Sequence, residues 1–402
     1  MFRAHGRGKL RIRRGQAERA EMATTSVNLD GLRELAAFRA ENGCAISLYL
    51  DLDPGRVPTA GDTATRVHSL LDVAAKSHGA TRPDLAHEVR SGLKADFERL
   101  EQFFDGEFDR DGAHGLAVFA AGLDNVWSVL TLPASVPDAA RVADDFLLAP
   151  LVPLLGRGND ALVAVVGREQ GRVLALRHGR LEPIADRTED MPGRHDQGGR
   201  SQARYQRHIE NIAQEHYRTV TEELEAQFRS LDRPRIVVVC GEDTRHEFAE
   251  TLPTEVADAV IGWTTAEAHA SDSDLHQIVA PWLEQWRAAR ESEAVERWRE
   301  ETGKGARGAS GWGKTLEAAA DGRVELLLYK EGVQKDAFRC PACGRASLDA
   351  STCPLDGTTM EARDDGLDLA VRLTLAHGGQ VLAAEHRQDL DPVDGIGAVL
   401  RY

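Results

Sequence analysis

Segments with the spacing of an amphipathic helix alternate with continuous apolar runs of strand length along the first third of the chain. The segments with helical spacing are residues 30–41, 64–77 and 83–104. The strand-like runs are residues 45–50, 114–119 and 126–130. Strands that alternate with helices in this way predict layers of helix and sheet, a mixed fold of the α/β (α+β) class.

The same patterns continue through the rest of the chain. Ala161–Val166 and residues 172–177 predict a hairpin-like pair of strands joined by residues 167–171. A long amphipathic helix is expected over residues 203–227, with apolar positions at Ile209, Ile212, Ala213, Tyr217, Val220 and Leu224. Further helices are expected at residues 241–252, 284–302 and 312–322. Further strands are expected at Arg235–Cys240 and at residues 324–329 and 395–402.

These segments predict three mixed α/β domains. A chain of 402 residues is long enough for two or three domains with separate cores. The expected domains are residues 22–157, 158–283 and 284–402, the last with a small cysteine-containing insertion at 338–360. Residues 1–21 differ in composition, with seven Arg or Lys residues and two Glu. This basic extension is compatible with an RNA-binding arm, a targeting peptide or a misassigned start, and we favour the last, with Met22 as the alternative start.

Composition places the chain among water-soluble globular proteins. Hydrophobic residues make up 42% of it and charged residues 28%. The longest apolar run, residues 146–155, contains two prolines and is too short to span a membrane. Five cysteines in a chain of this length do not suggest a disulfide framework and favour a reducing cytoplasm. The net charge of -16 argues against a general nucleic-acid binder but leaves room for local basic patches.

One such patch surrounds a glycine pair ahead of the long helix, in the sequence Gly198-Gly199-Arg200-Ser201-Gln202. Glycines allow the backbone to approach a partner closely. The patch has a positive excess that suits phosphate groups, because Asp196 is the only acid among four arginines. The arginines are Arg194, Arg200, Arg204 and Arg207. The alternative interpretation is an ordinary glycine loop in which Ser201 caps the helix.

This loop and helix resemble the middle domain of the archaeal and eukaryotic class-one peptide release factors, whose Gly-Gly-Gln loop also precedes a long helix. The glutamine comes two residues later here, a spacing similar to the Gly-Gly-x-Ser-Gln loop of the bacterial branch of that superfamily. The glycine-rich strand at residues 395–402 resembles the end of the third domain of release factors and Pelota, and residues 312–329 resemble its start. The first domain is similar more weakly, at residues 45–50 and 59–70.

The resemblance implies a translation factor that enters the ribosomal A site near the peptidyl-transferase region and hydrolyses peptidyl-tRNA. In that role Gln202 would position the nucleophile, Gly198 and Gly199 would shape the tip, and Arg200 with Arg204 would steady the acceptor end of the tRNA. Ester hydrolysis requires a placed water and a stabilised oxyanion. A translational GTPase is a further partner that the resemblance suggests. The alternative is a non-catalytic hibernation factor resembling Pelota and Balon.

A literal Gly-Gly-Gln occurs at Gly378-Gly379-Gln380, and we reject it as the catalytic loop. A short apolar run follows it rather than a long helix, so the glycines are expected to form a turn before a strand.

Stop-codon reading in the family depends on an Asn-Ile-Lys-Ser element at the start of a first-domain helix. The matching place reads Gly61-Asp62-Thr63-Ala64-Thr65, with an acid and no lysine. An acidic residue is poorly suited to messenger RNA. We therefore expect stop-codon-independent action, such as rescue of stalled ribosomes.

Cys340 and Cys343 form one Cys-x-x-Cys turn, and Cys353 with Asp356 forms a second of similar sequence. Two such turns predict a tetrahedral zinc site, because thiolates and a carboxylate oxygen are both zinc ligands. Archaeal release factors carry a similar ribbon in this domain. The alternative is a decayed ribbon without metal, and either way its role is structural. The isolated Cys44 and Cys240 are expected to be small core residues.

Other residues with chemical potential have ordinary explanations. His195, His208 and His216 flank the loop, but surface histidines on a polar helix are common. Asp51 and Asp53 resemble a metal pair, yet aspartates at a strand end before a proline usually form turns. The tryptophans are expected to pack cores rather than to stack bases.

Overall fold

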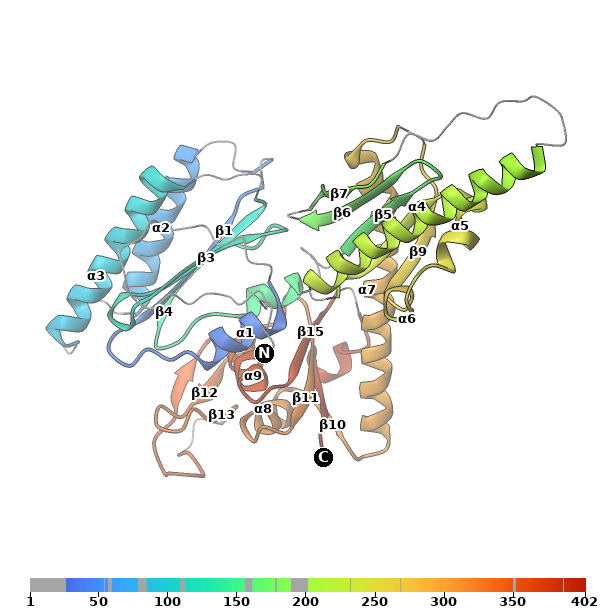
Figure 1. Cartoon of the computed structure of the whole chain (residues 1–402). Coiled ribbons are helices and arrows are strands. Elements are labelled where there is room, and N and C mark those ends of the chain that lie inside the picture. Colours follow the sequence, from blue (N-terminus) through green and yellow to red (C-terminus); the bar gives the residue numbers. More distant parts are fainter. Residues whose placement is uncertain are drawn as a thin grey trace, which may run out of the picture. The chain divides into compact units, whose positions relative to one another are not determined.

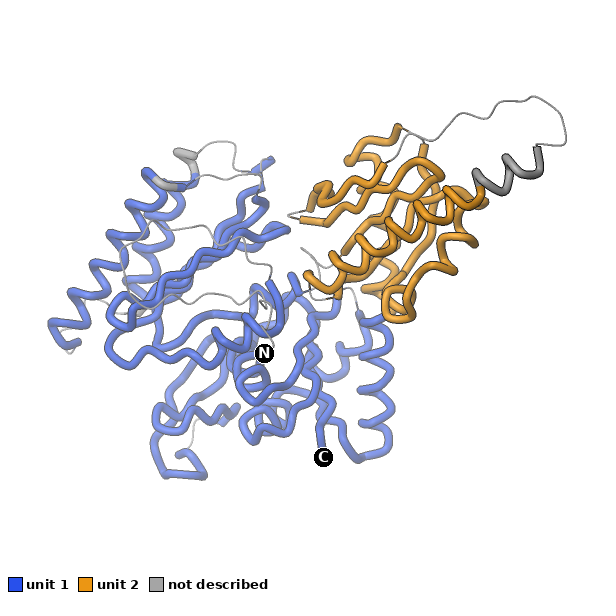
Figure 2. The backbone as a smooth tube through the Cα atoms, viewed as in Figure 1, with its two compact units in different colours: residues 1–157, 290–402 blue, residues 158–289 orange. Residues whose placement is uncertain are grey.

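A computed structural model describes residues 27–402 apart from 54, 57–59, 79–84, 109–112, 156–160, 178, 189–201, 232, 268, 350–351 and 386. For residues 60–62, 78, 107 and 202–209 it describes the backbone alone. The chain divides into two compact units (Figure 2). Unit 1 joins residues 1–157 to residues 290–402, and unit 2 comprises residues 158–289. Helices and sheets are mixed in both, which confirms the expected fold class.

The first sheet of unit 1 is antiparallel and has the strand order β3-β2-β1-β4. Its strands are β1 (Ala45–Asp51), β2 (Gly115–Ala121), β3 (Val126–Leu132) and β4 (Ala139–Ala143). The helices of this region are α1 (Leu29–Ala37), α2 (Ala60–His78) and α3 (His87–Gln102), with short helical turns at Phe103–Glu107, Gly122–Asp124 and Ala149–Leu154 (Figure 1).

Both faces of this first sheet are covered, which explains why β1 and β2 are buried at every position. One face, with Ile46 and Val118, packs against apolar residues of α2 and α3. The other face, with Tyr49 and Phe119, shares a core with residues from the C-terminal segment of the chain. A strand buried on both sides loses the alternation of apolar and polar residues and becomes a continuous apolar run.

The second sheet of unit 1 has the order β10-β16-β11-β15, with β11 and β15 parallel and the other pairs antiparallel. Its strands are β10 (Gly308–Ser310), β11 (Val324–Lys330), β15 (Gln380–Ala384) and β16 (Ile396–Leu400). Helices α8 (Trp312–Ala320) and α9 (Gly366–Ala376) pack against each other beside it, and Asp391–Val393 forms a short turn. A small third sheet holds β12 (Ala337–Arg339) between β13 (Ala346–Ser347) and β14 (Glu361–Arg363).

A buried group of ion pairs joins the two segments of unit 1. Asp145 is 1% exposed and lies 2.7 Å from Arg141, 2.9 Å from Arg339 and 3.3 Å from Arg372. Arg372 also donates to the carbonyl oxygens of Ala36 and Phe146. Because buried charges are tolerated only when they are paired, these contacts fix α9 against the first segment.

Asp368 extends this group from α9. Its Oδ1 atom accepts hydrogen bonds from the backbone N–H groups of Leu148 at 2.5 Å and Ala149 at 2.9 Å. Its Oδ2 atom lies 3.3 Å from Arg141, which also pairs with Asp365. The C-terminal segment therefore supplies partners for charges and backbone groups of the first segment.

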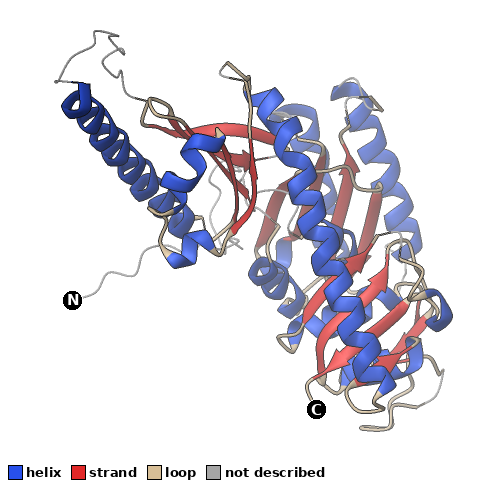
Figure 3. Ribbon diagram, turned by 90° about the vertical axis from the view of Figure 1, so that its right-hand side faces the viewer, coloured by secondary structure: helices blue, strands red, loops and turns tan. Residues whose placement is uncertain are grey.

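Unit 2 is a three-layer arrangement around a sheet of order β7-β6-β5-β8-β9 (Figure 3). Its strands are β5 (Ala161–Val166), β6 (Gly171–Arg177), β7 (Arg180–Asp186), β8 (Arg235–Cys240) and β9 (Val260–Thr264), and β5, β8 and β9 are parallel. Helices α4 (Gln202–Ser230), α5 (Glu242–Ala249) and α6 (Thr254–Ala257) contribute to the core on one face. Residues of α7 (Asp272–Gly303) up to Leu283 cover the other.

Most predicted elements are present, with shifted ends. The helix expected at 30–41 ends at Ala37, because Phe38 is extended and stacks on Phe146 with ring centroids 4.5 Å apart. The helix expected at 284–302 begins earlier, at Asp272, and passes through Pro281. The predicted domain boundary at 283 thus lies inside α7, and the division into three domains stays a prediction.

No helix in the described part of the chain is both long enough and apolar enough to cross a membrane.

Candidate functional site

The glycine loop lies between β7 and α4, and most of it falls outside the described residues. This applies to Arg194, Gly198, Gly199, Arg200 and Ser201, and also to His195. The side chains of Gln202, Arg204, Arg207 and His208 are likewise not described. What the structure describes is the support of this loop, namely the strand that leads into it and the helix that follows it.

Helix α4 begins at Gln202 and has 29 residues, about 43 Å at 1.5 Å per residue. The described part of its apolar stripe packs against β5, β6 and β8 and includes Ala213. The other buried apolar residues of the stripe are Tyr217, Val220, Leu224 and Phe228. Among the side chains that the structure describes, the first buried apolar one is that of Ala213, about 16 Å along the helix from Gln202.

The strand that leads into the loop is fixed to α4. Arg187 directs Nε and Nη2 at one carboxylate oxygen of Glu223, at 3.1 and 2.5 Å. Glu223 also accepts a hydrogen bond from Gln227 at 2.8 Å, and the bonds from Gln227 and Arg187 lower the pKa of its carboxyl group. The loop therefore starts from a position set by an ion pair to the helix that ends it.

Close packing beneath this ion pair depends on Gly171 in β6. The carbonyl oxygen of Gly171 accepts a hydrogen bond from the N–H of Arg187 at 2.6 Å. A Cβ atom on Gly171 would lie 2.4 Å from Val220, so any other residue would push α4 away from the sheet. Glycine here permits close approach of helix and strand.

The expectation for His216 as a surface histidine beside the loop is wrong. Its side chain is only 2% exposed and lies on the stripe between Ala213 and Val220, three and four residues away. Neither ring nitrogen has a hydrogen-bond partner among the described residues. Helical position, rather than closeness to the loop in sequence, determines that His216 belongs to the core.

The three cysteines and the aspartate of the predicted metal site lie together in unit 1. One potential ligand atom from each of Cys340, Cys343, Cys353 and Asp356 lies within 4.8 Å of the others. The Cys343 and Cys353 sulfur atoms are 3.4 Å apart, and Asp356 Oδ2 is 3.4 Å from the Cys340 sulfur. In a tetrahedral zinc site with Zn–S bonds of about 2.3 Å, ligand atoms lie about 3.3–3.8 Å apart. These two distances therefore fit zinc.

Local charge also suits a metal. The backbone N–H of Thr358 donates to Asp356 at 2.9 Å and lowers the pKa of that carboxyl group, which stays ionised. Burial raises the pKa of the Cys340 thiol, but the backbone N–H groups of Cys343 and Ala342 outweigh this effect and lower it overall. Ligation requires deprotonated groups, so both effects favour metal binding, whereas burial raises the pKa of the Cys343 thiol to about 12 and opposes it.

Two rejected candidates have the structural roles expected of them. Gly378 has φ of +75° and forms the turn before β15, and Gln380 begins that strand. Asp51 accepts from the N–H of Asp53, and Asp53 accepts from that of Gly55, both at 2.9 Å. These bonds confirm a turn at the end of β1.

Comparison with known proteins shows similarity to peptide release factors over the region that includes the loop and its support. Residues 147–282 match the model of the Bacterial archaeo-eukaryotic release factor family 10. The chain is 30% identical over 217 residues to peptide chain release factor subunit 1 of Methanopyrus kandleri, a match that spans about half of each chain, 52%. It is 24% identical over 403 residues to the corresponding protein of Archaeoglobus fulgidus, which covers 92% of this chain and 96% of that one.

Solved structures give weaker similarities. An archaeal translation termination factor is 17% identical, with a TM-score of 0.26, and the match covers 95% of this chain and all of that one. Archaeoglobus fulgidus Pelota is 16% identical, with a TM-score of 0.32 and coverage of 93% and 92%. Scores this low add nothing to the sequence matches.

Proposed function

We propose, from the premise that this chain is a bacterial archaeo-eukaryotic release-factor-like protein, that it enters the ribosomal A site and hydrolyses peptidyl-tRNA without reading a stop codon. Its product would be a peptide released from a stalled ribosome. The single observation that carries this proposal is the combination of the Gly198–Gly199 pair with Gln202 at the first position of a long, anchored helix.

The support of the loop suits a reaction in a narrow RNA cavity. Helix α4 begins at Gln202, directly after the loop, and its buried side chains from Ala213 onward belong to the core of unit 2. The Arg187–Glu223 ion pair sets where the loop begins. A catalytic group must be held in a defined place to gain rate, and both features provide this.

The chemistry assigned to the loop follows from its residue types. Glutamine is not a useful base at neutral pH, but its amide can orient a water molecule or a sugar hydroxyl. Backbone N–H groups near the glycines can face the developing oxyanion. Arg200 and Arg204, helped by Arg194, Ser201 and Arg207, would contact phosphates of the tRNA acceptor end.

Stop-codon-independent action is inferred from the sequence of the first residues of α2, Gly61 to Thr65. Asp62 and its neighbours replace the basic decoding element of the family. In this proposal the ribosome and peptidyl-tRNA are the partners, a translational GTPase is a candidate for delivery, and the compartment is the cytoplasm. The cluster of Cys340, Cys343, Cys353 and Asp356 would hold one structural zinc ion that stabilises β12–β14.

One observation favours a second function. Arg200 and Ser201 separate the glycine pair from Gln202, so the amide lies two residues beyond its place in a literal Gly-Gly-Gln loop. If this spacing keeps the amide away from the ester, the chain would occupy the A site without cleavage, as a hibernation factor.

The deciding experiment is a release assay with purified protein and ribosomes that carry labelled peptidyl-tRNA. Hydrolysis predicts single-turnover release of labelled peptide that depends on the concentration of the protein. Tight ribosome binding with no release above the rate without protein would reject the hydrolase and support the hibernation function.

A further inference from the structure

A small pocket of unit 2 lies at the carboxyl ends of β5 and β8, two neighbouring parallel strands. Three connections form its walls: the hairpin turn at Gly167, the turn at Gly241 after β8, and the segment between β9 and α7. The carboxyl edge of parallel strands is where α/β sheets bind ligands, because the connecting loops separate there. Nothing in the proposed release reaction uses this pocket.

The pocket is small and has an apolar floor. Its volume is about 150 Å³. A cavity of that size holds a molecule as large as benzene, about six non-hydrogen atoms. Val165, Val239 and Leu275 are buried apolar residues of its lining, and Ala270 adds a methyl group. A nucleotide is too large for this space, whereas a small metabolite with a short aliphatic group fits it.

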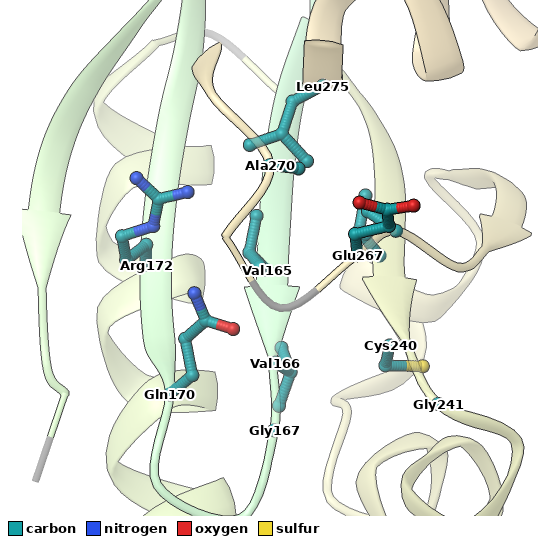
Figure 4. Close-up of a pocket in the computed structure, with 12 residues that line it drawn as sticks. Val165, Val166, Gly167, Gln170, Arg172, Cys240, Gly241, Glu267, Ala270 and Leu275 are labelled. Atoms are coloured by element: carbon teal, nitrogen blue, oxygen red, sulfur yellow. The ribbon is translucent and has the colours of Figure 1, made fainter.

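Groups of opposite charge line the two sides of the floor. Figure 4 shows Arg172 and Gln170 of the β6 side on one side of Val165, and Glu267 on the other. The Nη1 atom of Arg172 lies 3.3 Å from Asp272, but its Nε atom is buried and has no hydrogen-bond partner among the described residues. The carboxylate of Glu267 forms no ion pair within the described part of the chain.

We propose that this pocket binds a free α-amino acid with a small side chain, such as alanine, serine or valine. The guanidinium group of Arg172 donates to the ligand carboxylate, and Gln170 adds an amide donor. The ligand ammonium group donates to Glu267, and its side chain contacts the valine floor. A zwitterion satisfies both charges at once, which neither a simple anion nor a simple cation does. The site would make the stability of unit 2, which carries the glycine loop, depend on the supply of amino acids.

The experiment measures binding of L-alanine, L-serine and L-valine to the full-length protein by titration calorimetry and ligand-observed NMR, without ribosomes. Ligands this small reach dissociation constants on the order of 0.1–1 mM. L-lactate lacks the ammonium group and L-alanine methyl ester lacks the carboxylate, so both should bind at least about tenfold more weakly. The ester also tests whether the pocket takes an aminoacyl group instead of a free amino acid.

Variants assign the binding to this pocket. Glu267→Gln should weaken the binding of L-alanine about tenfold or more and leave the binding of L-lactate unchanged. Its control is Glu242→Gln, which removes a charge from the neighbouring helix outside the pocket and should leave the binding of both ligands unchanged. Arg172→Gln should weaken both ligands, with Arg168→Gln in the exposed hairpin turn as its control. Ala270→Leu fills the pocket without a charge change and should abolish binding.

Several results would overturn the proposal. They are the absence of amino-acid binding at about 10 mM ligand, equal binding of L-alanine and its methyl ester, and undiminished binding to a folded Ala270→Leu variant. Because the assay contains no ribosome or tRNA, its outcome is independent of whether the chain releases peptides.

Discussion

Asp356 occupies in the second cysteine-containing turn the position that Cys343 holds in the first. In both turns the N–H of the leading cysteine, Cys340 or Cys353, donates at 2.8 Å to the carbonyl oxygen five residues later. In both, a glycine with positive φ follows, Gly344 at +79° and Gly357 at +72°. The two turns are thus structurally equivalent, with a carboxylate in place of one thiolate.

Metal content tests this equivalence. The native protein should contain about one zinc ion per chain by elemental analysis, because four ligand groups complete a tetrahedral site. Cys340→Ser with Cys343→Ser should lose the metal and lower the midpoint of thermal unfolding, since metal binding is coupled to folding. Asp356→Cys should retain zinc and release it more slowly to a chelator than the native protein does. A metal-free native protein, purified without chelators, would contradict the prediction.

Replacement of the glutamine amide tests catalysis. Gln202→Ala keeps both glycines and all arginines, so ribosome affinity should change little. Peptide release should fall by roughly 10²–10³-fold, the effect of removing one preorganised polar contact to a transition state. Gln214→Ala, at an exposed position of the same helix, is the matched control and should release at the native rate. Equal release by Gln202→Ala and native protein would remove the amide from the mechanism.

Charge reversal at the loop tests the expected phosphate contacts. Arg200→Glu with Arg204→Glu should weaken ribosome binding, most clearly as salt rises, because contacts to phosphate depend on ionic strength. The measurement is ribosome pelleting at several salt concentrations. Unchanged binding at every salt concentration would place the RNA contacts elsewhere.

The ion pair at the start of the loop can be tested separately. Arg187→Ala should reduce the rate of peptide release more than ribosome affinity, because the loop keeps its own groups but loses one fixed end. Glu223→Gln should have a similar, smaller effect, since an amide still accepts one hydrogen bond. Arg229→Ala removes another arginine that pairs with a glutamate, Glu255, in the same unit, and serves as control. Equal release by all three variants would show that the Arg187–Glu223 pair only adds to stability.

The buried ion pairs of unit 1 predict a pH-dependent stability difference. Burial by itself would raise the pKa of Asp145, but Arg372, Arg141 and further guanidinium groups outweigh it and lower the pKa. The ionised form therefore stabilises the folded state above the unfolded pKa of about 3.9, and this contribution is lost as pH falls through the folded value. Asp145→Asn should cost about 3–5 kcal/mol near pH 7, because it leaves buried guanidinium groups without their carboxylate.

Denaturant unfolding at several pH values checks this. The stability gap between native protein and Asp145→Asn should begin to shrink below about pH 4, where the carboxylate becomes protonated in the unfolded state, and should close as pH falls through the lowered pKa of the folded state. Lys76→Ala removes one member of an exposed pair with Asp72 and should change stability by less than about 1 kcal/mol. A gap that is constant with pH would show that Asp145 contributes by packing alone. The pH dependence that Asp368 contributes to the free energy of unfolding has the opposite sign. Burial raises the pKa of its carboxyl group, so its stabilising contribution is lost as pH rises.

Codon dependence tests the substituted element around Asp62. Release should proceed at the same rate with a sense or a stop codon in the A site. A clear preference for stop codons would show that another surface of the first segment reads messenger RNA.

Sequence reasoning succeeded where the signal was local. The pair of cysteine turns was predictable because each turn is defined by residues three or four apart, and β5, β6 and α4 were predictable from their apolar period. The hydrophobic pattern does not predict burial that depends on contacts between residues far apart in the sequence. Nothing in the sequence predicted that Arg372 of α9 is buried against a carbonyl oxygen 226 residues earlier in the chain. The pocket at Arg172 and Glu267 was missed for the same reason, because three separate connections bring its residues together.

The core shared by residues 27–157 and 290–402 has a consequence for synthesis of the chain. The first segment can bury one face of its sheet against α2 and α3 as soon as it leaves the ribosome. Its other face, with Tyr49 and Phe119, shares a core with residues of a segment that is translated only after the whole of unit 2. Unit 2 can therefore complete its fold during translation while part of the apolar face with Tyr49 and Phe119 is still uncovered. A nascent chain arrested before residue 309 should expose that surface to chaperones.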